Sequence, residues 1–411
     1  MPPMAIELKV DTDAEEVGFD AGRLERIDRH FTRYVEEGRL PGWLIVVTRR
    51  GRVTHLSRCG HADVESGRLV EVDTLWRIFS MTKPVTSVAA MMLVEEGAFD
   101  LTDPIAKWLP EFAQPRVYVK GSALNPLTEP ATEPIRVWHL LTHTSGLTYG
   151  FHHAHPVDEM YRAAGFEWVT PPGLDLAACV ERWAQLPLVF QPGSEWNYSN
   201  SSDVLGRLVE VVSGQWLDEF FRQRIFAPLG MNDTSFGTEG DNLAALYVPQ
   251  PGTRTAVRDD AFGAVGRGRP DCLSGGGGLV STAADYHRFT QLLLRQGELD
   301  GVRLLSPRTV ALMTSNHLPG DVDLEAYGPL FPEMPFNGFG FGLGFSVLKD
   351  AVKAKTLSSA GEFAWGGAAS TAFWVDPAEE LTAMFFTQLL PSSTHPIRQQ
   401  LRQLVYQALV A

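Results

Sequence analysis

The sequence predicts a mixed α/β (α+β) fold in which an antiparallel sheet, built from both ends of the chain, is flanked by helices and carries an inserted, mainly helical domain. Two observations predict this arrangement. Strand-like segments lie near the N-terminus and in the last third of the chain, whereas the middle has helical periodicity. An order of strands, helices and strands is most simply accommodated when one sheet closes from both ends.

The length of 411 residues favours two domains that share a cleft. We expect residues 1–78 together with residues 275–411 to form the α/β domain, residues 79–274 to form the helical domain, and the active site to lie between them. Hydrophobic residues make up 44% and charged residues 20% of the chain, as in ordinary globular proteins. The net charge of −14 argues against nucleic acid or an anionic membrane as a partner, because both would repel the chain.

The location expected from the sequence is cytoplasmic. Met1–Val10 lacks the basic and apolar regions of a secretory signal. The longest apolar candidate, Val88–Val94, is too short to span a bilayer. Cys59, Cys179 and Cys272 form no C-x-x-C pair, so neither a disulfide framework nor a zinc site is expected. The oligomeric state stays open.

A helix and a hairpin are predicted at the N-terminus. Apolar residues recur at spacings of three and four from Asp20 to Glu37, and Gly38 follows as a stop. A buried strand beginning at Trp43, a turn at Arg50-Gly51 and a returning strand then form an antiparallel hairpin.

The middle of the chain is predicted to be mostly helical. A helix opens at Ser80 and closes at Gly97, and two more cover Asn200–Ser213 and Trp216–Phe226. Gln114–Pro134 and Thr148–Gly173 are rich in turn-forming residues. We expect both to be surface loops that shape a binding site.

The last third is predicted to return to the sheet. A helix is expected first, over Ala283–Gln296, and another closes the chain over Pro396–Val410. The strand-forming segments between them are Phe339–Leu348, Ser370–Val375 and Leu381–Gln388.

Ser80-Met-Thr-Lys83 is the first motif that could carry chemistry. The spacing places the serine and the lysine on one face of a helix. A serine becomes a good nucleophile when a neighbour accepts its proton, and a lysine can do so when its surroundings favour the neutral amine. The pattern alone is weak evidence, because S-x-x-K should occur by chance about once or twice in such a chain.

Two further segments could complete the site. Tyr198 stands where a turn-rich segment enters a helix, and a phenol beside a lysine can shuttle protons. Trp365-Gly366-Gly367-Ala368 precedes a strand, and the amides of Ala368 and Ser80 could form an oxyanion hole. Each segment also has a structural explanation, namely a half-buried tyrosine and a tight turn beside a core tryptophan.

Together these segments resemble the β-lactamase-like serine hydrolase superfamily, the fold of penicillin-binding proteins and class C β-lactamases. The resemblance runs from about Phe19 to the C-terminus and is closest to the family VIII carboxylesterases. The motifs that carry it, besides those of Tyr198 and Trp365, are Phe79-Ser-Met-Thr-Lys-Pro84, Leu101-Thr-Asp-Pro104, Trp138-His-Leu-Leu-Thr-His-Thr-Ser-Gly146, Phe226-Ala-Pro-Leu-Gly-Met231 and Gly276-Gly-Gly-Leu-Val-Ser-Thr282.

The resemblance implies that Ser80 is acylated and that Lys83 and Tyr198 share the base and acid roles. Which of the two is the first base stays open. It also implies that Asn200 lies beside the site. Trp365, with Gly366 and Gly367, would contact the substrate, at a position where β-lactamases and D,D-peptidases carry Lys-Thr-Gly or His-x-Gly.

A tryptophan at position 365 offers no cation to a β-lactam carboxylate, so neutral esters are favoured as substrates. We therefore expect a serine carboxylesterase acting on short to medium acyl esters. The alternatives are a β-lactamase or D,D-peptidase, an acyltransferase, and a non-catalytic relative of the same fold.

Other candidate motifs are rejected. No G-x-S-x-G nucleophile elbow occurs in the chain. The histidine tract Phe151-His-His-Ala-His155 has no acidic or cysteine partner near it in sequence, and Gly275–Gly278 is not followed by Gly-Lys-Ser/Thr. His143 is not expected to act as a triad histidine. We expect no metal and no cofactor.

Overall fold

An eight-stranded antiparallel sheet joins the two ends of the chain in the computed structural model, which describes residues 8–168, 170–328 and 336–411. Its strand order is β12-β13-β14-β15-β16-β1-β2-β3. β1 pairs with β16 along its length, from Leu44 opposite Phe386 to Arg49 opposite Leu381. The prediction of a sheet built from both chain ends is therefore confirmed. The bounds are β1 Gly42–Arg49, β2 Arg52–Asp63, β3 Arg68–Leu69, β12 Phe339–Phe341, β13 Ser346–Leu348, β14 Phe363–Gly366, β15 Ala372–Asp376 and β16 Leu381–Phe386.

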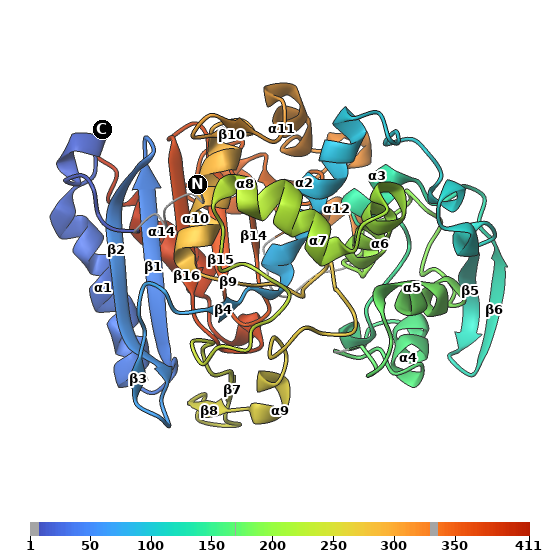
Figure 1. Ribbon diagram of the computed structural model, residues 1–411, viewed down its shortest axis with the longest axis horizontal. Helices are drawn as coiled ribbons and strands as arrows, with labels where there is room; N and C mark the ends of the chain where they lie inside the picture. Colours follow the sequence, from blue (N-terminus) through green and yellow to red (C-terminus); the bar gives the residue numbers. More distant parts are fainter. Residues whose placement is uncertain (1–7, 169, 329–335) are drawn as a thin grey trace.

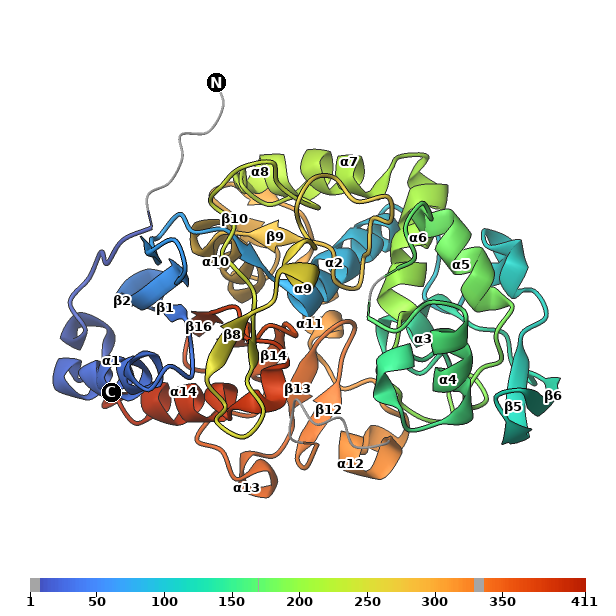
Figure 2. The same cartoon turned by 90° about the horizontal axis from the view of Figure 1, so that it is seen from below.

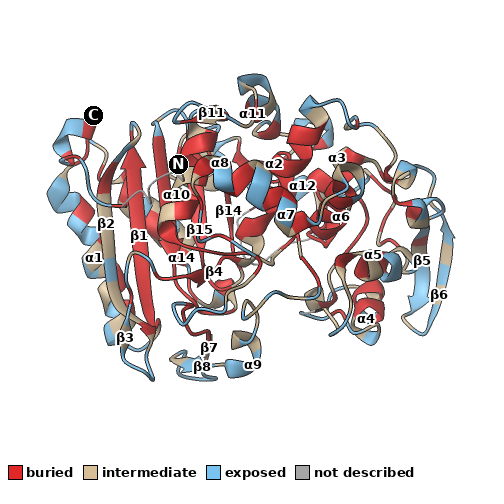
Figure 3. Ribbon diagram, viewed as in Figure 1, coloured by how far each residue is buried: buried red, intermediate tan, exposed pale blue. Residues whose placement is uncertain are grey.

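Both faces of the sheet are covered by helices, and β1 is accordingly buried along its whole length (Figure 3). Side chains alternate between the faces of a strand, so Trp43 and Ile45 face α1 (Ala21–Glu36) and α14 (Ile397–Tyr406). Leu44 and Val46 face the opposite way, into the core that also contains α10 (Ala283–Leu294). The sheet is therefore packed between α1 and α14 on one face and the core that contains α10 on the other.

α2 (Thr82–Glu95) links the sheet to the helical part, as Figure 1 shows. All its residues from Thr82 to Leu93 are buried, so the helix is enclosed by the rest of the molecule although it includes Lys83 and three hydroxyl residues. It packs against α6 (Ser201–Ser213). The other helices of this part are α3 Val137–Leu141, α4 Pro156–Ala163, α5 Leu176–Ala184, α7 Leu217–Phe221 and α8 Ala227–Leu229.

The segment expected to be a surface loop over Gln114–Pro134 contains a hairpin of β5 (Arg116–Ser122) and β6 (Asn125–Pro130). Most of its side chains are exposed, so it does lie on the surface. The two strands were not predicted because the segment contains prolines and only a short apolar pattern. Prolines are nevertheless tolerated in a hairpin at the edge of the fold. The second expected loop, Thr148–Gly173, contains α4.

The remaining elements are short. β7, β8 and α9 form an excursion that lies over the boundary between the sheet and the helical part (Figure 2). The bounds are β4 Trp76–Arg77, β7 Tyr247–Pro249, β8 Ala256–Arg258, α9 Asp260–Gly263, β9 Val280–Ser281, β10 Glu298–Leu299, β11 Val302–Arg303, α11 Pro307–Met313, α12 Leu324–Tyr327 and α13 Ala351–Ala354. In the part of the chain that the structure describes, no helix has the length and apolarity needed to cross a bilayer.

Candidate active site

Ser80 lies in a single 3₁₀ turn, Phe79–Met81, that leads directly into α2. Lys83, in the first turn of α2, donates hydrogen bonds to the Ser80 hydroxyl (Nζ to Oγ, 3.2 Å) and to the Gly276 carbonyl (2.7 Å). The lysine side chain is only 2% exposed. The two residues are therefore held together, away from bulk water, in the geometry that proton transfer from a serine needs.

The backbone that presents Ser80 is strained and closely packed. Phe79 has a φ of 42°, a left-handed conformation that a non-glycine residue rarely adopts and that is often found beside functional residues. A Cβ atom on Gly367 would collide with the carbonyl of Ile78 and with the hydroxyl of Thr371. Glycine at position 367 thus lets the end of β14 approach the turn that carries the serine.

Tyr198 lies beside Lys83. The lysine Nζ is 4.5 Å from the centre of the Tyr198 ring and 5.4 Å from the centre of the Tyr149 ring, within the range of cation–π attraction. Tyr198 lies two residues before Asn200, which is the N-cap residue of α6. The structure therefore brings together Ser80, Lys83 and Tyr198, with Asn200 beside them.

Asp203 is a residue of this site that the sequence reasoning missed. Its buried carboxylate accepts hydrogen bonds from the Ser274 hydroxyl (2.5 Å) and the Gly276 amide (3.0 Å). Burial raises the pKa of Asp203, and the positive charge of Lys83 acts in the opposite direction. A signal was present in the sequence, because Asp203 follows Asn200 by three positions and so shares its helix face.

One cavity of about 410 Å³ contains Ser80, Asn200 and Asp203 in its lining. Ala368, the expected second oxyanion donor, lines the same cavity from the turn after β14. The expected surface segment Thr148–Gly173 supplies several of its walls. The aromatic residues of the lining are Phe79, Tyr149, Phe151, Tyr161, Phe166, Trp168, Trp183, Tyr198, Phe236 and Phe262.

Trp365 and Gly366 are placed differently from the sequence-based expectation that they contact substrate. Neither of them, nor Gly367, is among the residues that line the Ser80 cavity. Trp365 is buried, with its ring centre 5.4 Å from that of Tyr198, so it supports the tyrosine from behind. A Cβ atom on Gly366 would collide with the guanidinium of Arg398, on the α14 side of the sheet. Adjacent residues of β14 point to opposite faces, so Trp365 lies on the Tyr198 side of the sheet and Gly366 on the α14 side.

The histidines near the site have structural partners. His143 is buried 3.2 Å from the Ser199 hydroxyl, and burial, followed by the charges of Lys83 and His152, holds its pKa well below the usual value. His152 donates a hydrogen bond of 2.6 Å to the Tyr198 carbonyl.

The other two residues of the histidine tract point elsewhere. His153 pairs with Glu167, and the His155 side chain accepts a hydrogen bond from the amide of Val157 at the start of α4. Within residues 8–168, 170–328 and 336–411, no group of three or more His, Cys, Asp or Glu side chains could hold a metal ion.

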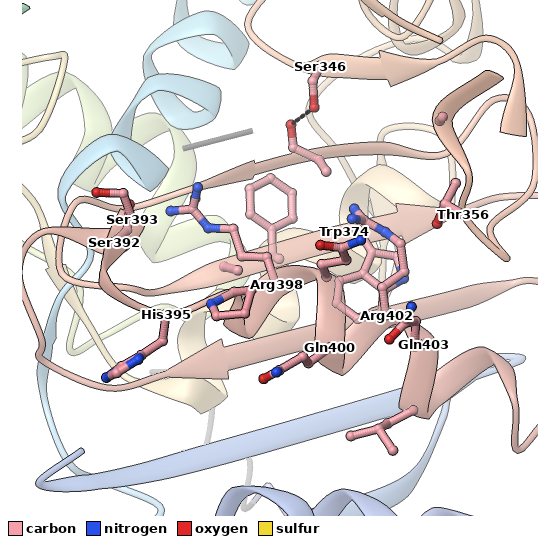
Figure 4. Close-up of a pocket in the computed structure, with 18 of the residues that line it drawn as sticks. Ser346, Thr356, Trp374, Ser392, Ser393, His395, Arg398, Gln400, Arg402 and Gln403 are labelled. Atoms are coloured by element: carbon pink, nitrogen blue, oxygen red, sulfur yellow. Dashed lines mark hydrogen bonds between the residues drawn. The ribbon is translucent and has the colours of Figure 1, made fainter. Parts of the chain in front are cut away.

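A second cavity, of about 920 Å³, lies along α14 (Figure 4). Trp365 and Gly366 line it, together with Arg398, Arg402 and His395. Arg398 projects from α14 toward the sheet and donates a hydrogen bond of 2.9 Å to the Gly367 carbonyl. This cavity therefore lies behind the turn that carries Ala368, whereas the smaller cavity contains Ser80.

Comparison with known proteins shows the family to which the chain belongs. The family model described as Beta-lactamase matches residues 27–407. The protein Rv1367c of Mycobacterium tuberculosis is 39% identical over 87% of this chain and 88% of its own length. The esterase EstB of Burkholderia gladioli is 33% identical over 96% of this chain and 98% of its own length. A solved structure described as EstCE1, a hydrolase with promiscuous acyltransferase activity, superposes with a TM-score of 0.79 at 29% identity and covers 94% of this chain and 98% of that one.

Proposed function

The chain belongs to the Beta-lactamase family and is a serine hydrolase, and we propose that it hydrolyses carboxylic esters with short to medium acyl groups through an acyl-enzyme on Ser80. The observation that carries the proposal is the contact of 3.2 Å between Lys83 Nζ and Ser80 Oγ, beside the ring of Tyr198. Two relatives named as an esterase and a hydrolase support the same reaction.

In the proposed mechanism, Ser80 Oγ forms a bond to the ester carbonyl carbon while its proton passes to Lys83 or Tyr198. The amides of Ser80 and Ala368 stabilise the negative charge that develops on the carbonyl oxygen. The carbon–oxygen bond to the alcohol then breaks, and the alcohol leaves with the proton. In the second half, water attacks the acyl carbon and gives its proton to the same base. The bond between the acyl carbon and Ser80 Oγ then breaks, the base returns the proton to Oγ, and the acid leaves.

The experiment that tests this function combines kinetics with covalent labelling. The purified chain should hydrolyse p-nitrophenyl acetate and butanoate, and a fluorophosphonate should attach to Ser80, as mapped by mass spectrometry. Ser80→Ala should lose about a thousandfold or more of kcat/KM and all of the label, because only binding and oxyanion stabilisation remain. Ser122→Ala, on the exposed strand β5, is the control. Wild-type turnover in Ser80→Ala would overturn the assignment.

Acyl transfer to an alcohol is a second candidate, because it shares the first half-reaction. The specific observation that favours it is the aromatic lining of the Ser80 cavity, which suits an organic acceptor. EstCE1, a structural neighbour, is described as a hydrolase with promiscuous acyltransferase activity. Product analysis with p-nitrophenyl butanoate and benzyl alcohol in water separates the two, since transfer yields benzyl butanoate and hydrolysis yields butanoic acid.

Hydrolysis of β-lactams is less well supported by the site. Residue 365 is a buried tryptophan, so the position where the resembling enzymes carry a lysine offers no positive charge to a carboxylate. Side-by-side turnover of a p-nitrophenyl ester and a chromogenic cephalosporin tests this preference.

The domain division, the location and the partner are further parts of the proposal. The Ser80 cavity is lined both by the 79–274 segment, with Tyr198, and by the 275–411 segment, with Ala368 and Leu390, which supports a site between two domains. The three cysteines are free, which supports the cytoplasm as the compartment. The partner is a small-molecule ester.

A further inference from the structure

A row of stacked aromatic rings leads from the catalytic lysine to the surface. The Tyr149 ring lies 5.4 Å from Lys83 Nζ, and Phe151 stacks on Tyr149 with ring centres 4.6 Å apart and an angle of 21° between their planes. Trp168 stacks on Phe151 at 4.5 Å and 15°. Trp168 is 42% exposed, so the row reaches solvent. We refer to Tyr149, Phe151 and Trp168 as the aromatic row.

The aromatic row presents ring edges to the cavity. Tyr149 and Trp168 both stack on Phe151, at 4.6 Å and 4.5 Å. One face of a phenyl ring has no room for two rings stacked at these distances, so we infer that the two neighbours cover its opposite faces. All three residues line the cavity that contains Ser80. The surface that they leave for a ligand is therefore made mainly of ring C–H edges. Phe262, from α9, closes the outer end of the row with an edge contact to Trp168 at 6.2 Å and 89°.

Ring edges discriminate between flat aromatic groups and saturated groups of the same size. The edge of an aromatic ring carries partial positive charge and the face carries partial negative charge, so an edge attracts the face of another ring. A saturated ring of similar area gains the apolar burial but not this attraction. At about 410 Å³ the cavity is within the range of ligand pockets, roughly 300–1,000 Å³.

We propose that the aromatic row binds a flat aromatic group of the ester, with the face of that group against the edges of Tyr149, Phe151 and Trp168. This inference rests on the proposed function and narrows its substrate class to aryl-bearing esters. Because the row begins beside Lys83, a group bound there remains connected to a carbonyl at Ser80. The group belongs either to the alcohol or to the acyl part, and matched substrates identify which.

The test compares esters that differ only in the flatness of one ring. 2-Naphthylmethyl butanoate and decahydro-2-naphthylmethyl butanoate test the alcohol part, and ethyl 2-naphthylacetate and ethyl decahydro-2-naphthylacetate test the acyl part. The wild type should favour the aryl ester in one of the pairs by about two- to tenfold in kcat/KM. Phe151→Leu and Trp168→Leu should bring that ratio close to one, and Trp168→Phe should keep most of it.

Trp216→Leu is the matched control, since Trp216 is 53% exposed and is not among the residues that line the cavity. It should retain both the rate and the aryl preference. Ratios near one in the wild type, or an aryl preference that survives both leucine variants, would overturn the inference while leaving ester hydrolysis in place.

A binding measurement separates failure of the inference from failure of the proposed function. Calorimetric titration of Ser80→Ala with 2-naphthylmethanol and with decahydro-2-naphthylmethanol should show tighter binding of the aromatic alcohol if the row recognises the alcohol part. If the row recognises the acyl part, titration with 2-naphthylacetate and with its saturated analogue should show tighter binding of 2-naphthylacetate. Absence of turnover on ethyl butanoate and on all four ring esters contradicts the esterase function. Equal binding within both pairs contradicts the aromatic-row inference, whatever the turnover.

Discussion

Arg398 Nη2 donates a hydrogen bond of 2.9 Å to the carbonyl oxygen of Gly367, which joins the closing helix α14 to the turn after β14. The same nitrogen lies 3.3 Å from the Thr371 carbonyl, at the other end of that turn. Gly366 permits the contact, because a side chain there would occupy the space of the guanidinium. Since Ala368 follows Gly367 directly, Arg398 is placed to orient the proposed oxyanion donor.

Arg398→Ala should therefore lower kcat for ester hydrolysis by about tenfold with a smaller change in KM. A displaced donor weakens transition-state stabilisation, and full loss of such a donor costs about a hundred- to a thousandfold. Arg398→Lys should recover part of kcat, because its ammonium can reach one carbonyl. Steady-state kinetics check this, with the melting temperature as a control for folding. Equal losses in the Ala and Lys variants, in step with lost stability, would make the role purely structural.

Lys83→Ala and Tyr198→Phe should each cripple acylation, and the double variant should be little worse than the more damaged single one. Lys83 contacts Ser80 and lies beside the Tyr198 ring, so the two side chains should act as one proton-transfer unit, whose losses are not additive. Pre-steady-state release of p-nitrophenol measures the acylation step directly. Additive losses would instead assign one of them a role in packing alone.

Asp203→Asn should move the acidic limb of the pH profile of kcat/KM to lower pH. The Asp203 carboxylate stabilises the positive charge of Lys83. The same attraction between the two charges opposes the rise in the pKa of Asp203 that burial causes. Without the carboxylate, the neutral amine that accepts a proton is reached at lower pH. A pH series with p-nitrophenyl butanoate measures the shift. An acidic limb at unchanged pH would favour Tyr198 over Lys83 as the first base.

Trp365→Phe should lower kcat several-fold and leave KM nearly unchanged, because the indole supports Tyr198 rather than lining the Ser80 cavity. Trp365→Lys should lose more ester activity and gain little affinity for cephalosporins, since the new ammonium would be buried against the tyrosine ring. Kinetics on both substrate types provide the measurement. A tenfold gain in cephalosporin affinity would return Trp365 to the substrate site.

His287 should make the protein less stable in mild acid. Burial, followed by the charge of Arg288, lowers the pKa of His287 to about 4, and its ring bonds the Thr48 hydroxyl at 2.9 Å. The unfolded chain, with a histidine pKa of about 6.5, binds the proton first. Stability is therefore complete above pH ~6.5 and falls as the pH drops toward 4, by on the order of 2 kcal/mol at pH 5.

His287→Gln should flatten this part of the pH dependence, as measured by urea unfolding at pH 7.5 and pH 5. His317→Gln, at a half-exposed position, should leave it unchanged. His139, with a pKa lowered to about 4, and His143, with a pKa well below its usual value, act in the same direction, so part of the pH dependence should remain. A slope identical to that of the wild type would contradict the assignment to His287.

Much of the fold was predictable because it depends on local pattern. The spacing of apolar residues indicated α1 within one residue at each end, and the alternation of strands with a turn at Arg50-Gly51 indicated the hairpin of β1 and β2. The proximity of Ser80 and Lys83 also follows from their separation of three positions, which places two side chains on the same face of a helix. These features are set by neighbours in sequence, whose geometry the backbone constrains.

Other features of the site depend on contacts between distant segments, and tertiary structure alone decided them. Arg398 lies 31 residues from Gly367, and Ser274 lies 71 residues from Asp203, so no local period indicates either pair. The side of the sheet that each residue of β14 faces was likewise open in the sequence. Trp365 therefore looked like a substrate contact until the packing of the sheet against Tyr198 placed it behind the tyrosine. The physical reason is that helical and strand periods follow from the covalent chain, whereas the partners across a site follow from how complete elements pack.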